Sequence, residues 1–450
     1  MAEAMSRALT TGALAIAERN VPRYTSYPTA PHFTAAVGPQ IYADWLGRLP
    51  REATVSLYIH VPFCAELCFY CGCNTRAVRR REPVEAYAGR LLDEIALLGL
   101  AGRKLTHLHW GGGTPSILDP RWLETIAARL ASLFDLSALK EHAIELDPRR
   151  LDRALVRTLA TIGVTRASLG MQDASPQVQR AIGRIQPFEL VECAAGWLRE
   201  AGIEDLNIDL MYGLPGQSAR DVARSAELAA SLKPQRLALF GYAHVPWFKT
   251  HQRLIDEAAL PGLSARLEQA QVAAETLQGF GYEAVGLDHF ALPDDTLALA
   301  GRDQRLRRNF QGYTTDDADA LIGLGASAIG RLPQGFVQNA PDVAGYARAV
   351  GQGRFATVKG LALTDDDRLR AAAIERLMCD LEVDLDRLEG GAHYFAHELA
   401  TFGSLAAEGI VRVEGSRIVM TPQARPFTRI AAAVFDAYLG SGEKRHSLAV

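Results

Sequence analysis

Short apolar runs of strand length alternate with longer segments of helical periodicity through the first half of the chain. The strand-like runs fall at 55–60, 105–110, 142–146, 167–171, 206–211 and 236–240. Helix-period segments lie between them, at 84–98, 121–133, 151–162, 188–201 and 219–231. This alternation predicts parallel βαβ units. Six such units are fewer than the eight of a closed barrel, so the pattern predicts an α/β fold built on a partial (β/α)6 barrel with an open side.

The pattern changes after about residue 290. Segment 304–315 is basic and aromatic and is expected to be a loop, whereas 318–329 is rich in small residues and glycine. A compact helical unit begins near 363, and residues 409–420 alternate as two strands around a Glu-Gly-Ser turn, which resembles a winged-helix domain. The chain therefore divides into an N-terminal extension (1–52), a partial barrel (53–290), a barrel-completing and substrate-proximal segment (291–362) and a C-terminal, mostly helical, winged-helix-like domain (363–450).

Composition places the chain among ordinary soluble proteins. Of its 450 residues 48% are hydrophobic and 22% charged, and the net charge of −4 argues against nucleic-acid binding. No apolar run approaches the length of a membrane span. Residues 8–17 faintly imitate a signal peptide, but Thr10 and Thr11 break the run and Glu3 lies where positive charge belongs, so an amphipathic helix is favoured. The winged-helix-like unit is not strongly basic, which favours a lid or packing role over DNA binding.

Three thiols fall within eight residues directly after the first strand-like run. Cys64, Cys68 and Cys71 form a C-x3-C-x2-C motif. Three thiolates on one loop can hold three corners of a [4Fe–4S] cluster and leave one iron open for a small molecule. A structural zinc site needs a fourth ligand, and the only further thiol nearby is Cys73. The motif therefore favours the cluster over zinc, and a cluster of low potential favours a reducing, cytoplasmic location.

Polar residues collect where the strand-like runs end, which in parallel barrels is where active sites lie. They are Gly111–Pro115, Glu145, Asp147, Gln172, Asp173, Asp209 and Tyr242–His244. Glycines permit close backbone approach, and carboxylates such as Glu145 and Asp209 can bind ribose hydroxyls or an ammonium group, although each could also be a solvated strand end. Aromatic residues near the thiols could screen a cluster, yet such residues are more often core; they are Tyr58, Phe69, Tyr70 and Trp110. The isolated Cys193 and Cys379 are expected to be buried core thiols.

The cysteine spacing is the signature of the radical S-adenosylmethionine (SAM) enzymes, and this loop resembles theirs. That resemblance implies that the open iron binds the amino and carboxylate groups of SAM, and that one electron cleaves SAM to a 5′-deoxyadenosyl radical. Motifs beyond the generic core narrow the resemblance to the oxygen-independent coproporphyrinogen III oxidases. These motifs lie at 21–28 (VPRYTSYP), 72–74 (GCN), 109–115 (HWGGGTP), 145–148 (ELDP), 170–173 (GMQD), 207–215 (NIDLMYGLP), 242–246 (YAHVP), 288–290 (DHF) and 308–315 (RNFQGYTT).

This resemblance implies an oxidoreductase of haem and porphyrin biosynthesis that acts without oxygen. Its reaction would be oxidative decarboxylation of two propionates of coproporphyrinogen III to vinyl groups, giving protoporphyrinogen IX. It also implies cluster ligation by Cys64, Cys68 and Cys71 and the binding of two SAM molecules. Residues matching contacts of the SAM on the cluster are Tyr58, Gly112, Glu145 and Ile329. Those matching contacts of the second are Tyr70, Gly113, Thr114, Gln172, Arg184, Asp209 and Ala243, with Gly183 standing where the family pattern leads us to expect asparagine.

A substrate with four carboxylates calls for cationic partners. The candidates are Arg23, Arg302, Arg305, Arg307 and Arg308, each of which could instead be a solvated loop charge. An electron donor and an electron acceptor are required but not identified, and a monomer is expected. Three other functions stay open at this point: a haem-chaperone-like paralogue, another radical SAM modification of a tetrapyrrole, and an iron–sulfur sensor that uses the C-terminal domain.

Overall fold

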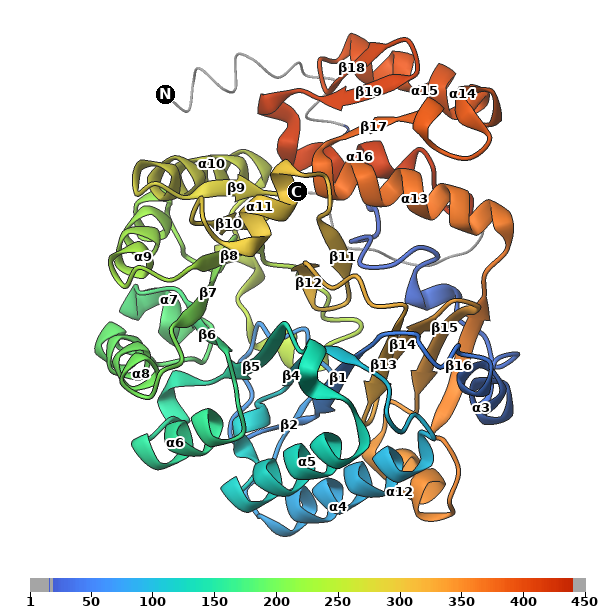
Figure 1. Ribbon diagram of the computed structural model, residues 1–450. Helices are drawn as coiled ribbons and strands as arrows, with labels where there is room; N and C mark the ends of the chain where they lie inside the picture. Colours follow the sequence, from blue (N-terminus) through green and yellow to red (C-terminus); the bar gives the residue numbers. More distant parts are fainter. Residues whose placement is uncertain (1–15, 17–18, 440–450) are drawn as a thin grey trace.

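A twelve-stranded sheet organises the computed structural model, which describes residue 16 and residues 19–439 (Figure 1). Six strands run parallel in chain order at its centre, and their presence confirms the predicted partial barrel. They are β1 (Val55–Val61), β4 (Leu105–Gly112), β5 (Glu141–Leu146), β6 (Arg166–Gln172), β7 (Asp205–Tyr212) and β8 (Arg236–Gly241). The proposed helix at 8–17 lies outside the described residues apart from Ile16.

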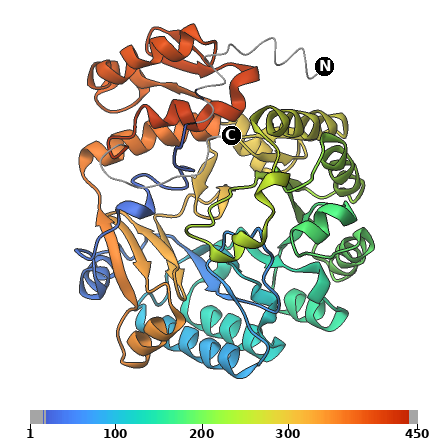
Figure 2. The ribbon, with the colours of Figure 1, turned by 180° about the vertical axis from the view of Figure 1, so that it is seen from behind.

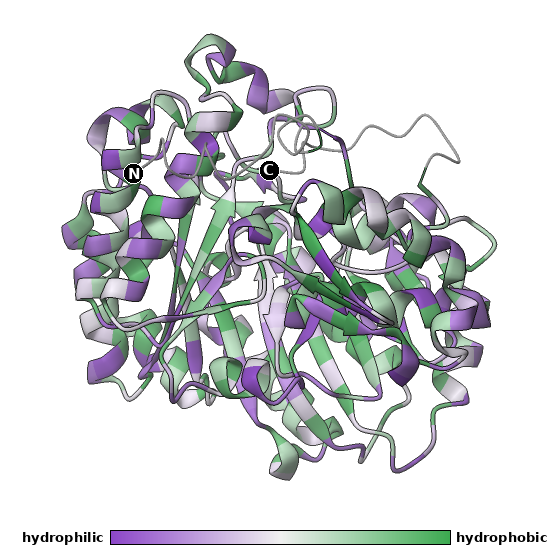
Figure 3. Ribbon diagram, turned by 90° about the horizontal axis from the view of Figure 1, so that it is seen from above, coloured by the Kyte–Doolittle hydropathy of each residue, from purple (hydrophilic) through white to green (hydrophobic). Residues whose placement is uncertain are grey.

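Helices cover the outer face of these strands, as Figures 1 and 2 show from opposite sides. Polar side chains at their starts accept backbone N–H bonds: Asp119, Asp152 and Ser218 cap three of them. The strands are largely buried, as expected when both faces of a parallel sheet are covered, and hydrophobic residues concentrate on them in Figure 3. The helices are α4 (Glu82–Leu97), α5 (Pro120–Leu133), α6 (Arg153–Thr161), α7 (Pro176–Ala181), α8 (Phe188–Glu200) and α9 (Ala219–Ser231).

Both edges of the barrel sheet are extended by later parts of the chain. Antiparallel β10 (His289–Ala291) and β9 (Glu283–Val285) follow β8 after α10 (Leu263–Gly279). At the other edge β13 (Ala320–Leu324) runs parallel to β1. The strands beyond β13 are antiparallel: β14 (Ile329–Leu332), β15 (Gly335–Asn339) and β16 (Thr357–Ala362). The remaining helices of this region are α3 (Pro39–Gly47), α11 (Thr296–Arg302) and α12 (Val343–Gly351).

The expectation of a loop at 304–315 was wrong. Residues of that segment pair as the hairpin of β11 (Arg307–Asn309) and β12 (Gly312–Thr314). Strands of three residues are too short for alternation to show in the sequence, and the pairing is supported by tertiary contacts such as the Tyr313 hydroxyl, which donates to the Met378 carbonyl oxygen at 2.5 Å.

A buried carboxyl group joins α4 to the added strands. Glu94 is 1% exposed and accepts hydrogen bonds from the Gly325 N–H, the Asn339 Nδ2 and the Tyr346 hydroxyl at 2.7, 2.7 and 2.8 Å. Burial raises the pKa of Glu94 to about 7 and outweighs these three donors, which lower it. The carboxyl group therefore takes up a proton near neutral pH in the folded chain, but only in acid in the unfolded chain.

This difference predicts a stability that depends on pH. Because the folded pKa of Glu94 is the higher one, the group's contribution is fully present below the unfolded pKa and is lost as pH rises through about 7. We expect the free energy of unfolding to fall by up to about 3 kcal/mol from this group between pH 5 and pH 8, since one pK unit is ~1.4 kcal/mol. Urea unfolding of the protein and of Glu94→Gln at both pH values measures it; a difference between the two proteins that does not change with pH contradicts the assignment.

The C-terminal region packs above the sheet edge that carries β9 and β10 (Figure 1). Its hairpin is the one expected from the sequence, with the turn at Gly415 and Ser416. Its elements are α13 (Asp365–Asp380), β17 (Glu382–Asp384), α14 (Gly391–Tyr394), α15 (Ala396–Ala407), β18 (Val411–Glu414), β19 (Arg417–Met420) and α16 (Thr428–Ala433). Among the described residues no helix is long and apolar enough to cross a membrane. The four-part division of the chain stays a prediction.

The N-terminal segment before α3 lies against this region. The Tyr24 hydroxyl donates to Asp436 Oδ2 at 2.9 Å, and the Ala437 N–H donates to the Tyr27 hydroxyl oxygen at 3.0 Å. Val21, Tyr24 and Tyr27 share one apolar cluster with residues of the C-terminal helices. Segments more than 400 residues apart are thus packed together.

Candidate active site

The loop with the three thiols begins at the end of a short strand. Cys64 ends β2 (Phe63–Cys64), which pairs with β3 (Arg76–Ala77), and the Val78 N–H donates to the Cys64 carbonyl oxygen at 2.9 Å. The two short strands close the loop at its base. Cys64 and Cys71 are half-buried and Cys68 is buried, so none of the three thiols is fully exposed.

Hydrogen-bond donors surround the sulfur atoms. Thr75 Oγ1 and Thr114 Oγ1 lie 3.2 and 3.5 Å from Cys64 Sγ, and Arg184 Nη1 lies 3.5 Å from Cys68 Sγ. A hydrogen bond from the Cys73 thiol lowers the pKa of Cys71 to about 7, against the effect of burial.

Thiolates are the form that binds metal. The sulfur environment therefore fits the three protein ligands of a [4Fe–4S] cluster. Among the residues described, no group of three His, Cys, Asp or Glu side chains is arranged so that it could hold a single metal ion.

The glycine triplet lies against this loop and leaves no room for side chains. A Cβ atom on Gly113 would lie 2.9 Å from Cys64 Sγ, and one on Gly111 would lie 2.8 Å from Glu145 Oε1. Gly112 has φ of 118°, a backbone conformation that favours glycine. The end of β4 can therefore approach the cysteine loop and whatever binds there with bare backbone.

The four residues matched to the SAM on the cluster lie together. Glu145 Oε2 accepts the Gly112 N–H at 3.1 Å, and the β1–β13 pairing places Tyr58 opposite Gly323. Gly323 in turn packs on the backbone of Ile329, since a Cβ there would lie 2.6 Å from its carbonyl oxygen. Contributions from β1, β4, β5 and β14 thus meet at the mouth of the barrel, although their role in SAM binding stays a prediction.

The residues matched to a second SAM are held mainly by hydrogen bonds within the site. Arg184 Nη2 donates to the Gly170 carbonyl oxygen at 2.8 Å and lies 3.4 Å from Asp147 Oδ1. Asp209 accepts from Ser168 Oγ at 3.0 Å and Asn207 Nδ2 at 2.8 Å. Burial, with the nearby Glu145 charge, raises the pKa of Asp209 to about 6.

The other members of this set extend from the cysteine loop to β8. Gln172 ends β6 with φ of 67°. Thr114 and Gly113 both lie against Cys64. Ala243 follows β8, and its carbonyl oxygen shares a hydrogen-bond donor, Gln252, with the carbonyl oxygen of Tyr70. Gly183, where the family pattern has asparagine, has φ of 65°, and a Cβ there would lie 2.9 Å from the Phe69 ring.

A short turn after β8 holds the cysteine loop from the opposite side. Lys249 Nζ donates to the Cys73 carbonyl oxygen at 2.9 Å, and His251 Nε2 lies 2.7 Å from the Cys71 carbonyl oxygen. Gln252, 1% exposed, donates to the carbonyl oxygens of Tyr70 and Ala243 at 2.9 and 3.2 Å. Buried carbonyl groups that lose their donor cost about 1–3 kcal/mol each, so this turn fixes the shape of the loop.

Replacing Gln252 with leucine is therefore expected to loosen the loop without removing a ligand. We expect reconstituted protein to bind iron and sulfide but to lose them several-fold faster on exposure to a chelator, because two buried carbonyl groups lose their partner. Chelator-driven bleaching of the cluster absorbance measures this rate. Gln352→Leu, at an exposed glutamine after α12, is the matched control; equal rates in both variants would show that Gln252 does not support the loop.

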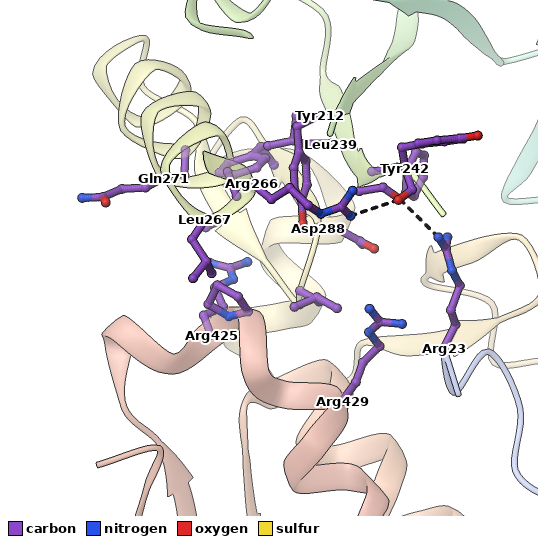
Figure 4. Close-up of a pocket in the computed structure, with 18 of the residues that line it drawn as sticks. Arg23, Tyr212, Leu239, Tyr242, Arg266, Leu267, Gln271, Asp288, Arg425 and Arg429 are labelled. Carbon is purple, nitrogen blue, oxygen red and sulfur yellow. Dashed lines mark hydrogen bonds between the residues drawn. The ribbon is translucent and has the colours of Figure 1, made fainter. Parts of the chain in front are cut away.

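A cavity of about 1150 Å³ opens beside the cysteine loop and reaches Cys73 and Ala243. Figure 4 shows guanidinium groups entering it from several elements: Arg266 from α10, Arg425 and Arg429 from the C-terminal region, and Arg23 from the N-terminal segment. Arg308 of β11 also lines it. Among the described residues, the lining of the cavity includes five arginines but only two carboxylates, Asp288 and Glu275.

Positive charge in this cavity exceeds what its own partners neutralise. Arg425 Nη2, Arg266 Nε and Arg308 Nε are buried without a hydrogen-bond partner. Burial and then repulsion from Arg23 lower the pKa of Arg429 to about 9. Burial would raise the pKa of Asp288, but the hydrogen bond from His289 and the charges of Arg308 and Arg23 hold it well below its usual range. The cavity is therefore built to receive several negative charges.

The sequence identified only part of this arginine set. Arg23 and Arg308 line the cavity as predicted. The other three are surface charges, the alternative that the sequence left open for each: Arg302 pairs with Glu283, Arg305 with Asp303 and Arg307 with Glu375. Arg266, Arg425 and Arg429 were missed. The signal was weak, since Arg425 lies in a 3-10 turn that contains Pro426 and Arg429 lies in the following α16, so no single helical period links them.

Two further expectations are corrected or resolved by burial. Cys193 is exposed on α8, so its prediction as a core thiol was wrong, whereas Cys379 is buried as predicted. An amphipathic helix has an outer face on which a small apolar residue can sit, and periodicity alone did not assign Cys193 to it. Trp110 is fully buried and donates to His142 Nε2 at 2.9 Å, so it belongs to the core.

Comparisons with known proteins agree with this geometry. The family model described as the radical SAM superfamily matches residues 58–229. The oxygen-independent coproporphyrinogen III oxidase of Bradyrhizobium diazoefficiens is 47% identical over 447 residues, which cover 97% of this chain and 99% of the relative. The enzyme of the same name from Escherichia coli is 38% identical over 93% of each chain.

A solved structure extends the agreement to the whole fold. The structure of coproporphyrinogen III oxidase (HemN) from Escherichia coli, described as a radical SAM enzyme, matches with a TM-score of 0.88 and 37% identity. The match covers 94% of this chain and 100% of that one. The chain therefore belongs to the oxygen-independent coproporphyrinogen III oxidase family of radical SAM enzymes.

Proposed function

We propose that this protein converts two propionate side chains of coproporphyrinogen III to vinyl groups, giving protoporphyrinogen IX without oxygen. The observation that carries the proposal is the cavity of about 1150 Å³, which places five arginines beside the cysteine loop. A macrocycle with four carboxylates matches both the size and the charge of such a space, since arginine binds carboxylates through paired hydrogen bonds.

The cluster and SAM, when bound, supply a radical that removes a hydrogen atom from a propionate. Cys64, Cys68 and Cys71 hold the cluster, and the Thr75, Thr114 and Arg184 donors stabilise their thiolates. Tyr58, Gly112, Glu145 and Ile329 are assigned to the SAM on the cluster. Assigned to a second SAM are Tyr70, Gly113, Thr114, Gln172, Arg184, Asp209 and Ala243.

The arginines orient the substrate and help to release the product. We assign Arg425, whose buried Nη2 has no hydrogen-bond partner, and Arg266 to bind substrate carboxylates. Each decarboxylation removes one negative charge from the ligand. Protoporphyrinogen IX keeps two of the four carboxylates, so the same arginines bind product more weakly than substrate.

The surrounding protein excludes water from the reacting groups. A radical that attacks an unactivated C–H bond also attacks exposed groups, and the C-terminal region with the N-terminal segment covers the open side of the barrel (Figure 2). We place the reaction in a reducing, cytoplasmic compartment, with the chain acting as a monomer. It requires an electron donor for SAM cleavage and an electron acceptor for each propionate.

An anaerobic assay tests the proposal. Cluster-reconstituted protein would receive SAM, a strong reductant, an electron acceptor and coproporphyrinogen III, and tetrapyrroles and 5′-deoxyadenosine would be separated and quantified. We expect vinyl product, with one deoxyadenosine formed for each propionate lost. Deoxyadenosine without vinyl product would move the substrate elsewhere among tetrapyrroles, and tight haem binding without either product would favour a haem chaperone.

A further inference from the structure

A second hollow lies behind the cysteine loop, outside the arginine-lined cavity. It encloses about 370 Å³, and its lining includes Ala65, next to Cys64, and Thr114. Thr114 Oγ1 is 3.5 Å from Cys64 Sγ. The hollow therefore reaches within one residue of a cluster ligand, and it shares no lining residue with the arginine-lined cavity.

Four arginines line the rim of this hollow: Arg79, Arg80, Arg81 and Arg150. All are exposed, and the side chains of Arg81 and Arg150 are 85% and 51% exposed. The first three belong to one segment with β3, which pairs with the strand that ends in Cys64. The residue before Arg79 is hydrogen-bonded to the cluster loop, since the Val78 N–H donates to the Cys64 carbonyl oxygen.

The carboxylates around the hollow are already engaged. Asp119 pairs with Arg81 and caps α5, and Glu85 pairs with Arg121. Asp147 binds Arg149, and Asp152 caps α6. Arg79 and Arg80, in contrast, take part in no ion pair or side-chain hydrogen bond among the described residues. Two exposed positive charges thus remain uncompensated on a chain whose net charge is negative.

We propose that this hollow and its rim, Arg79, Arg80, Arg81 and Arg150, form the docking surface for an acidic one-electron carrier protein that reduces the cluster. The inference rests on the proposed function only in that SAM cleavage needs an electron. The carrier, a reduced flavoprotein or iron–sulfur protein, loses one electron and the cluster gains it, with no bond made or broken. Docking here lets electrons enter while substrate occupies the other side of the loop, and opposite charges speed such encounters.

Stopped-flow reduction of the cluster tests the docking surface. The probe is a chemically reduced flavodoxin, an acidic flavoprotein, mixed with reconstituted protein in the absence of any tetrapyrrole. We expect the double variant Arg79→Glu/Arg80→Glu to be reduced about tenfold or more slowly at low salt, and to bind oxidised flavodoxin more weakly. Photoreduced deazaflavin, a small uncharged reductant, should reduce both proteins at the same rate.

The matched control is Arg220→Glu/Arg224→Glu on the outer helix α9, which changes the net charge equally. A second control is Arg253→Glu, on the turn that covers the loop from the opposite side. Slow reduction in either control to the same extent would overturn the proposal. So would a wild-type rate with flavodoxin that does not fall with added salt, a measurement that decides the matter even if the rim variant fails to fold. Because no tetrapyrrole is present, failure of the proposed function would leave this result unaffected.

Discussion

Replacing Cys68 with serine is expected to abolish SAM cleavage and vinyl formation together. Cys68 is the most buried of the three thiols, at 7% exposed, and two guanidinium groups face its sulfur: Arg184 Nη1 at 3.5 Å and Arg149 Nη2 at 3.9 Å. A serine hydroxyl is a poor iron ligand because it does not deprotonate at neutral pH. We expect iron and sulfide content to fall sharply and both products to drop to background.

The exposed Cys193→Ser on α8 is the matched control, since it also removes one thiol but lies outside the site. It should keep full iron content and full activity. Iron and sulfide analysis, with quantification of 5′-deoxyadenosine, separates the two variants. A Cys68→Ser protein that retains a complete cluster and cleaves SAM at the normal rate would refute the assignment of the ligand.

Replacing Arg425 with glutamine should weaken substrate binding without affecting the cluster. Arg425 Nη2 is a buried donor without a partner in a cavity that collects positive charge. A hydrogen bond to a charged group is worth about 2 kcal/mol, which corresponds to a roughly thirtyfold rise in KM for coproporphyrinogen III. Steady-state kinetics measure this, and the iron content and the rate of SAM cleavage without substrate should not change.

Arg307, a surface arginine outside the cavity, supplies the matched control for Arg425. Arg307→Gln removes the same charge from a residue that pairs with Glu375 at 2.8 Å outside the cavity. Exposed ion pairs contribute little, so its KM should stay within about twofold of the wild-type value. Equal effects of the two substitutions would mean that the net charge of the protein, and not the cavity, determines substrate binding.

Local pattern was sufficient for the elements that the barrel repeats. Strands β1 and β4 to β8 are largely apolar runs, long enough for their burial to show in the sequence, and the cysteine spacing is a property of a single loop. The sequence did not predict the added strands β13 to β16. Their place in the sheet depends on pairing with other strands, and hydrophobic periodicity along the chain does not reveal that pairing. The arginine-lined cavity could not be predicted for the same reason. Arg266, Arg425 and Arg429 come from α10 and the C-terminal region, and only folding brings them together.

Two adjacent arginines show how a cavity residue and a surface residue can look alike in the sequence. Arg307 and Arg308 are adjacent in a basic segment, yet Arg308 faces the cavity with its guanidinium group 4.5 Å from the centre of the Tyr313 ring, whereas Arg307 points to Glu375. Side chains alternate between the faces of a strand, so recognising β11 as a strand would have separated them. The error in the loop prediction and the undecided roles of Arg307 and Arg308 thus have one cause.

The contact between Tyr24 and Asp436 has a consequence for the order in which the protein matures. A ribosome releases the barrel and the cysteine loop long before it releases residues 425–436, because chains are made from the N-terminus. Arg425 and Arg429, which line the cavity, are therefore synthesised well after the cysteine loop. A chain that lacks residues 425–436 can hold the thiols but cannot enclose a tetrapyrrole, so we expect radical chemistry on the substrate to begin only after this segment has been synthesised and folded.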